Sequence, residues 1–102
     1  MIDLIEKLGK AHGPSFALER EIMWAVQNIP EHQQSPHDRP SNYTASIDAA
    51  LELLPSPRWF WRIDSHDPSA WVYLNIQDAF KGEGKTPAIS LCIAALKARS
   101  AR

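Results

Sequence analysis

The sequence predicts an α/β fold, a small α-β-α sandwich in which two or three antiparallel strands lie between helices. Three observations support this class. Apolar side chains recur at helical spacing in four segments. Two short segments rich in aromatic and β-branched residues lie between the third and fourth of these, separated by turn-forming residues. The chain has 102 residues, 44% of them hydrophobic, which predicts one domain, residues 1–102, around one core.

The first two helices have recognisable ends. Residues 2–11 form the first helix, and Gly13-Pro14 breaks it because proline lacks an amide donor and restricts the residue before it. Ser15 is a typical N-cap for a second helix that runs to about residue 28. Trp24 lies off the apolar stripe of this helix, so we expect it to be exposed or to pack away from the main core.

A long polar loop and a third helix follow. Residues 30–42 contain three prolines and show no periodicity, which predicts a loop of the length that is usually functional or mobile. The third helix spans about residues 45–54 and ends at Pro55, with Thr44 or Ser46 as its cap.

Two strands are predicted at residues 58–64 and 70–76, joined by turn residues 65–69. Alternation places two sets of side chains on opposite faces: Trp59, Trp61, Ile63, Val72, Leu74 and Ile76 on one, and Arg58, Phe60, Arg62, Trp71 and Tyr73 on the other. Neither face is simply polar, so we expect cover on both sides. Two strands alone are marginal, so a further strand or a partner chain should complete the sheet. Residues 77–86 are interpreted as turn-rich.

The last helix, over residues 87–99, has the clearest start. Thr86 is its N-cap and Pro87 occupies its first position. The segment is apolar nearly all round, so we expect it to be the most buried helix. Cys92, the single cysteine, lies in its middle and should behave as a small hydrophobic side chain rather than as a nucleophile.

Composition excludes several classes. Eleven basic and twelve acidic residues leave a net charge of −1, which argues against a DNA-binding protein. No apolar run approaches the roughly 18 residues of a membrane span. The first residues include Glu6 and Lys7 where a secretory leader would be apolar, so we expect a cytoplasmic protein with a reduced cysteine.

Several segments together resemble a known family. These are residues 43–51, the tryptophan-rich strands, and Thr86-Pro87-Ala88 leading into residues 91–99. They resemble the phage ABA-sandwich domain of small bacteriophage and prophage proteins, as do residues 4–8 with Gly13-Pro14, whereas the 30–42 loop is the least similar part. The resemblance implies a helix–sheet–helix sandwich and an accessory role, such as countering host defence. It implies no reaction.

The sequence gives little support for a catalytic site or a metal site. In Gly82-Glu83-Gly84-Lys85-Thr86, Ala79 stands where a nucleotide-hydrolase loop needs its first glycine, although the helix start beside Lys81 and Lys85 could still bind an anion. No paired carboxylates or triad order appear, so we expect no enzyme activity and no cofactor. No metal is expected either, because no standard ligand spacing is found among His32, His37, His66, Asp38, Asp64 and Asp67.

The strand face with arginines among aromatic residues is the leading candidate site. Aromatic rings can stack on a planar base while arginine holds its phosphate. The other interpretation is that these aromatic side chains form core, with the arginines at strand ends. The expected ligand-binding residues are Arg58, Trp59, Arg62, Trp71, Tyr73, Lys85 and Thr86.

These observations predict a phage accessory protein that sequesters a small nucleotide immune signal, of the cyclic nucleotide or cyclic ADP-ribose type, without cleaving it. The analogy is with phage proteins of other families that act as sponges in the host cytoplasm. We expect a homo-oligomer, with Trp24 and the strand edge as contacts. The alternative is a protein-interaction module without a small ligand, in which the 30–42 loop and exposed aromatic side chains dock on a host or phage protein.

Overall fold

The computed structural model describes residues 1–35, 37–56, 58–64, 69–75 and 77–101. Within these ranges the elements are α1 (Ile2–Lys10), α2 (Phe16–Val26), the short 3-10 helix η1 (Glu31–Gln33), α3 (Ile47–Leu51), β1 (Phe60–Ile63), β2 (Ser69–Tyr73), β3 (Ala79–Glu83) and α4 (Pro87–Ser100). The three strands form one antiparallel sheet in the order β1-β2-β3. The predicted α/β class with antiparallel strands is therefore confirmed.

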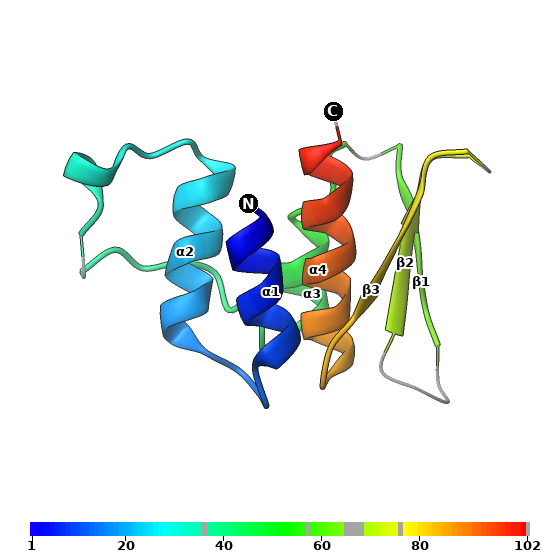
Figure 1. Ribbon diagram of the computed structural model, residues 1–102, viewed down its shortest axis with the longest axis horizontal. Helices are drawn as coiled ribbons and strands as arrows, with labels where there is room; N and C mark the ends of the chain where they lie inside the picture. Colours follow the sequence, from blue (N-terminus) through cyan, green and yellow to red (C-terminus); the bar gives the residue numbers. More distant parts are fainter. Residues whose placement is uncertain (36, 57, 65–68, 76, 102) are drawn as a thin grey trace.

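Helix α4 is the central layer of the molecule (Figure 1). It packs against β2 and β3 on one side and against α1 and α3 on the other, while α2 packs on α1. The helices therefore lie on one side of the sheet, and the sheet is the outermost layer rather than the central one. Cover on both faces of the sheet, which the sequence led us to expect, is not found among the described residues. A helix that is apolar all round can serve both neighbouring layers, which explains this order.

The core is centred on α4, as the sequence predicts. Ten of its fourteen residues are buried. Thr86 Oγ1 accepts a hydrogen bond from Ile89 N at 3.2 Å, and Pro87 is the first helical residue, which confirms the predicted start. Gly82 of β3 lies directly against the helix, because a Cβ atom there would be 2.6 Å from Ala94 N.

The third strand corrects the interpretation of residues 77–86 as turn-rich. Ala79–Glu83 pair with β2, with Tyr73 opposite Ala79 and Ala70 opposite Gly82. The turn between the two strands is built by Asn75, whose Oδ1 accepts hydrogen bonds from Gln77 N and Asp78 N, both at 2.8 Å. Glycine, lysine and glutamate are weak strand formers, so pairing with β2, rather than local propensity, makes this segment a strand.

A buried polar cluster joins α2 to the segment before α3. Glu19 is only 5% exposed, and its Oε2 accepts hydrogen bonds from Thr44 Oγ1 at 2.7 Å and Thr44 N at 3.0 Å. Thr44 Oγ1 also accepts from Ser15 N at 2.8 Å. Ser46 is the cap of α3, accepting from Ala49 N at 3.3 Å, so the sequence alternative with Thr44 as cap is not the one adopted.

The 30–42 loop is held in place by Trp24. The indole Nε1 of Trp24 donates to Asp38 Oδ2 at 2.8 Å, and Ser35 N donates to the same oxygen at 3.0 Å. The hydrogen bond from Trp24, followed by that from Ser35, holds the pKa of Asp38 below its usual value. Trp24, which lies off the apolar stripe of α2, thus packs against this loop. The loop accounts for the position of the Trp24 side chain without a contact to a second copy.

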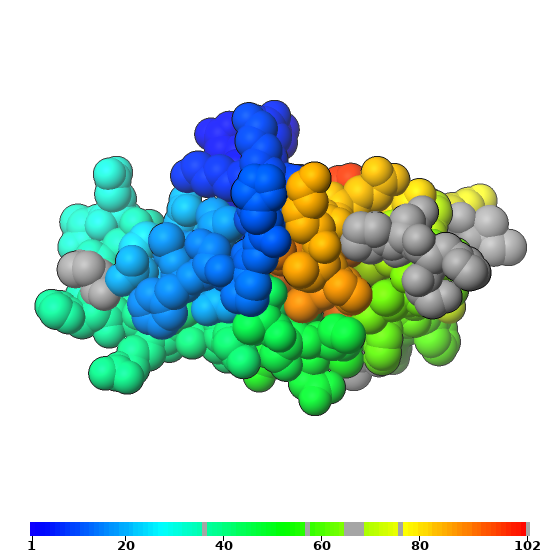
Figure 2. Space-filling view, turned by 90° about the horizontal axis from the view of Figure 1, so that it is seen from below, coloured from blue at the N-terminus to red at the C-terminus, as the bar shows by residue number. Residues whose placement is uncertain are grey.

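The molecule is elongated, with extents of 39 × 28 × 22 Å. Figure 2 shows the 30–42 segment, in cyan and green, at one end of the long axis and the sheet, in yellow and yellow-green, at the other. The loop and the sheet therefore cannot contribute to a single small-molecule site. No helix in the described part of the chain is long and apolar enough to cross a membrane.

Cys92 is buried in α4, and its thiol donates a hydrogen bond to Tyr43 O at 3.1 Å. Burial raises the pKa of the Cys92 thiol from 9.0 to about 12. As the pH rises, the unfolded chain therefore loses the thiol proton before the folded chain does. The stability contributed by the protonated thiol is fully present below pH 9.0 and is lost as the pH rises toward about 12.

We expect a chromogenic thiol reagent to leave Cys92 unmodified in the native protein and to modify it once urea unfolds the chain, since the thiolate is the reactive form. Between about pH 8 and about pH 11, wild type should lose more stability in urea melts than Cys92→Ala, which has no thiol to titrate. Rapid labelling of the native protein at neutral pH would contradict this picture of the thiol.

Candidate ligand-binding site

The face of the sheet turned away from α4 carries the arginine and aromatic side chains. Directly paired residues project from the same face. Phe60 lies opposite Tyr73 and Arg62 opposite Trp71, while the pairs on the other face include Ala70 and Val72, which are buried against α4. The register confirms the predicted separation for the residues of β1 and β2, whereas Ile76 lies outside the described residues. We call this surface the outer face, formed by Phe60, Arg62, Asp64, Ser69, Trp71, Tyr73, Ala79, Lys81 and Glu83.

The outer face is organised in three rows that run across the strands. The first row is aromatic and apolar, with Phe60, Tyr73 and Ala79; the middle row has one tryptophan between two cations, with Arg62, Trp71 and Lys81; the third row is acidic at both ends, with Asp64, Ser69 and Glu83. Each row takes one residue from each strand, or from the residue just after it. The pattern arises because side chains two positions apart along a strand share a face.

The aromatic row forms an open platform. The rings of Phe60 and Tyr73 are stacked, with centroids 5.6 Å apart and planes 25° apart, and Phe60 is 58% exposed. A shallow depression of about 450 Å³ lies over this row and the middle row, lined by Phe60, Arg62, Trp71, Tyr73, Leu74, Asn75 and Ala79. No described helix covers it (Figure 1). A planar ligand can therefore reach these rings from solvent.

The middle row places positive charge beside an indole ring. Lys81 Nζ lies 5.9 Å from the centroid of the Trp71 ring, within the range of a cation–π contact. Each cation also approaches an acid of the third row: Arg62 Nε is 3.7 Å from Asp64 Oδ1, and Lys81 Nζ is 3.1 Å from Glu83 Oε1. Exposed ion pairs of this kind contribute little to the stability of the fold. A phosphate that approaches Trp71 can therefore draw either cation toward itself.

Arg62, Trp71 and Tyr73 are the predicted site residues that the structure brings together. Trp59 is a correction: it is 5% exposed, belongs to the core, and has its ring centroid 6.1 Å from that of Phe80. Its ring is therefore not available to stack on a ligand. Arg58 is exposed just before β1, next to this face.

Lys85 and Thr86 lie away from the platform. They follow the end of β3 beyond Glu83, at the start of α4 (Figure 1). The Thr86 hydroxyl caps the helix, and capping accounts for this helix start without a ligand. Phe60 of the aromatic row and Lys81 of the middle row were absent from the predicted site. Phe60 had been placed on this face by alternation, but Lys81 could not be placed without β3.

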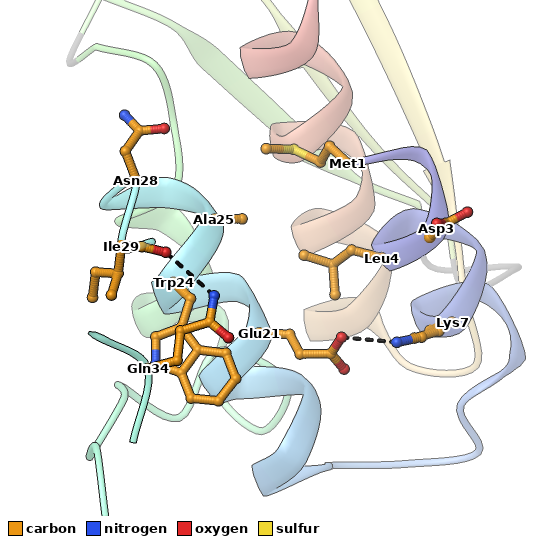
Figure 3. A pocket seen from close by; sticks show the side chains of 10 residues that line it. All are labelled: Met1, Asp3, Leu4, Lys7, Glu21, Trp24, Ala25, Asn28, Ile29 and Gln34. Carbon is orange, nitrogen blue, oxygen red and sulfur yellow. Dashed lines mark hydrogen bonds and ion pairs between the residues drawn. The ribbon is translucent and has the colours of Figure 1, made fainter. Parts of the chain in front are cut away.

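A second hollow, of about 480 Å³, lies between α1 and α2 (Figure 3). Lys7 Nζ and Glu21 Oε1 form an ion pair at 2.8 Å across it, and this hydrogen bond raises the pKa of Lys7. Gln34 Nε2 donates to Ile29 O at 3.2 Å on the other wall. Lys7 and Glu21 in this hollow already satisfy each other. It is therefore a weaker candidate than the outer face.

Within the described ranges, no three histidine, cysteine, aspartate or glutamate side chains come close enough to hold a metal ion. Asp38 accepts from Trp24, and Asp64 Oδ2 accepts from Ser69 Oγ at 3.0 Å. His66 and Asp67, which belong to the metal combination considered from the sequence, lie outside the described residues.

Comparison of the chain with protein-family models, with curated proteins and with solved structures finds no match. The resemblance to the phage ABA-sandwich domain therefore stays a prediction. The functional argument rests on the residues of the outer face.

Proposed function

We propose that this protein binds a small nucleotide on its outer face and sequesters it without cleaving it. The observation that carries the proposal is the middle row, in which Trp71 lies between Arg62 and Lys81. A base stacks over Trp71 and the adjoining aromatic row, and either cation reaches its phosphate. Trp71 on the central strand supplies a ring for stacking, and Arg62 and Lys81 on the two neighbouring strands supply the cations for ion pairing.

The energies on this face suit a small ligand. Stacking contributes about 1–3 kcal/mol per base, and each charge-assisted hydrogen bond about 1.5–3 kcal/mol. Association itself opposes these terms by about 4–15 kcal/mol. One base and one phosphate on one chain therefore give weak binding, and tight sequestration needs a second set of contacts. With a net charge of −1, the chain is not suited to a long nucleic acid.

Two nucleophile candidates near the sheet are poorly placed for cleavage. Ser69 is buried and its hydroxyl donates to Asp64. The Cys92 thiol lies in α4, on the opposite side of the sheet, and burial raises its pKa to about 12. These features favour binding and release of an intact ligand. We extend the proposal to the predicted setting, a phage accessory protein acting as a homo-oligomer in the host cytoplasm, where such signals are made.

Calorimetry against cyclic dinucleotides, cyclic trinucleotides and cyclic ADP-ribose isomers tests the proposal. We expect one class to bind, and Arg62→Ala and Trp71→Ala each to weaken it by roughly 10- to 100-fold, the equivalent of about 1.4–2.8 kcal/mol. Arg39→Ala is the matched control, because Arg39 is exposed in the loop at the other end of the molecule. Heating the complex should return the nucleotide chemically unchanged. If no class binds, or if the ligand is recovered hydrolysed, the proposal is wrong.

The alternative function, docking on a host or phage protein, is favoured by one observation. Trp61 is 44% exposed and Phe60 is 58% exposed, on opposite faces of β1. A pull-down from infected cells beside a thermal-shift screen of nucleotides separates the two functions. A specific protein partner with no nucleotide shift supports docking.

A further inference from the structure

We infer that two copies of this chain pair antiparallel through β1, in a register centred on Trp61, and form one continuous sheet with a shared outer face. The pairing is argued from the edge strand alone. Its consequence for the ligand rests on the proposed function.

The free edge of β1 has hydrogen-bonding groups available. Asp64 N donates to Ser69 O at 3.0 Å, so the backbone groups of Asp64 face β2. Backbone groups alternate in direction along a strand, and those of Trp61 and Ile63 therefore point away from β2, toward the edge. No described strand pairs there, because β1 is the first strand of the order β1-β2-β3. An exposed row of this kind is a template for another strand.

Two aromatic side chains of this edge strand are exposed. Protected edges carry lysine, proline or a bulge, whereas β1 presents Phe60 and Trp61, both substantially exposed. Helix α4 packs against β2 and β3, so β1 extends beyond the helical layer. A second copy placed along the edge would cover Trp61 with its own Trp61, from the same side of the sheet.

Charge complementarity selects both the occupant and the register. When Trp61 lies opposite the second copy's Trp61, antiparallel pairing sets Arg62 opposite Phe60. Arg58, which is exposed in the turn just before β1, then lies near Asp64 of the second copy, just after its β1. Opposite charges thus come near each other twice, once on each side of the twofold axis. A shift of two residues in one direction sets Arg62 opposite Arg62, and a shift in the other sets Arg58 opposite Arg62. Like charges directly opposite are unfavourable, so the register centred on Trp61 is preferred over both of these shifts.

The pairing doubles the outer face and makes it symmetric. Residues directly opposite each other project from the same side. Arg62 and Phe60 of one copy therefore lie beside Phe60 and Arg62 of the other, around the twofold axis. A symmetric site of this kind is isologous and matches a ligand with the same symmetry. Of the nucleotides considered above, a cyclic dinucleotide has two bases and two phosphates in that arrangement, so it is the expected class.

Light scattering across a concentration series tests the pairing of two chains through β1. Wild type should reach twice the chain mass of 11.5 kDa at micromolar concentration. Arg58→Asp and Asp64→Arg should each weaken the dimer by about tenfold or more, because each sets like charges opposite at both ends. The double variant, and an equimolar mixture of the two single variants, should restore it. Arg39→Asp makes the same charge change in the distant loop and should have no effect.

The outcomes separate the two proposals. A wild type that stays monomeric, or single variants that are not rescued by mixing, overturns the pairing, and circular dichroism of each variant shows whether it is folded. Calorimetry with a cyclic dinucleotide should give one ligand per two chains. A dimer that binds no nucleotide overturns the proposed function and leaves the pairing intact. Binding of one ligand per monomeric chain overturns the pairing and leaves the proposed function intact.

Discussion

Replacing Gly82 with alanine should destabilise the protein by about 3 kcal/mol, at the upper end of the usual range for overpacking. A Cβ atom at this position would lie 2.6 Å from Ala94 N and closer still to the carbonyl oxygen of Ser90. Both neighbours are backbone atoms of a buried helix, so they cannot rotate aside as the end of a side chain would. The added methyl group must push β3 away from α4, along the contact on which the core depends.

Urea unfolding followed by circular dichroism measures this loss. Gly9→Ala is the matched control, because a Cβ atom at Gly9 would meet no atom within 4 Å and the residue lies in α1. Alanine favours a helix over glycine by up to about 1 kcal/mol, so this variant should equal or exceed wild type in stability. A loss below about 1 kcal/mol for Gly82→Ala would mean that the sheet and α4 can separate easily.

Replacing Thr44 with valine should cost about 2–3 kcal/mol, because hydrogen bonds to a charged partner are the stronger ones. Valine has nearly the same shape as threonine, but it cannot donate to Glu19 Oε2 or accept from Ser15 N, which lie at 2.7 and 2.8 Å from Thr44 Oγ1. The Glu19 carboxylate would remain in the interior with one hydrogen bond fewer. Burial of an incompletely satisfied polar group is the physical reason for the loss.

Thermal and urea melts of Thr44→Val and Thr44→Ser test this. Serine keeps the hydroxyl and removes only a methyl group, so Thr44→Ser should lose less than about half as much stability as the valine variant. Equal losses for the two variants would show that packing of the methyl group, rather than the hydrogen bonds to Glu19 and Ser15, determines the stability of this region.

Local signals predicted the parts of the fold that depend on neighbours in sequence. Thr86 and Pro87 gave the start of α4, and the all-round apolar pattern after them gave its central place. Strand β3 has no such signal, because Lys81 and Gly82 form a strand only through their pairing with β2. The buried Glu19 was also out of reach, since its partner Thr44 lies 25 residues away in sequence.

The candidate site divides in the same way. Strict alternation placed Phe60, Arg62, Trp71 and Tyr73 on one face before any register was known. Alternation does not predict which face of the sheet a helix covers, because that depends on the packing of α4, which is distant in sequence. Trp59 belongs to the covered side, where its ring meets Phe80, and Lys81 joins the middle row only through the register of β3.

The central position of α4 also determines how the protein comes apart. Helix α4 makes the main contact with the described part of the sheet, and α1 and α3 pack on the opposite side of the helix. Separating either layer exposes an apolar face of α4 to water, which disfavours a partly folded unit that keeps only one layer. A chain of this size with one shared helix therefore unfolds as a single cooperative unit. Ligand bound at the sheet would for the same reason make the opening of the distant helices less favourable, because it stabilises the state in which both layers are folded.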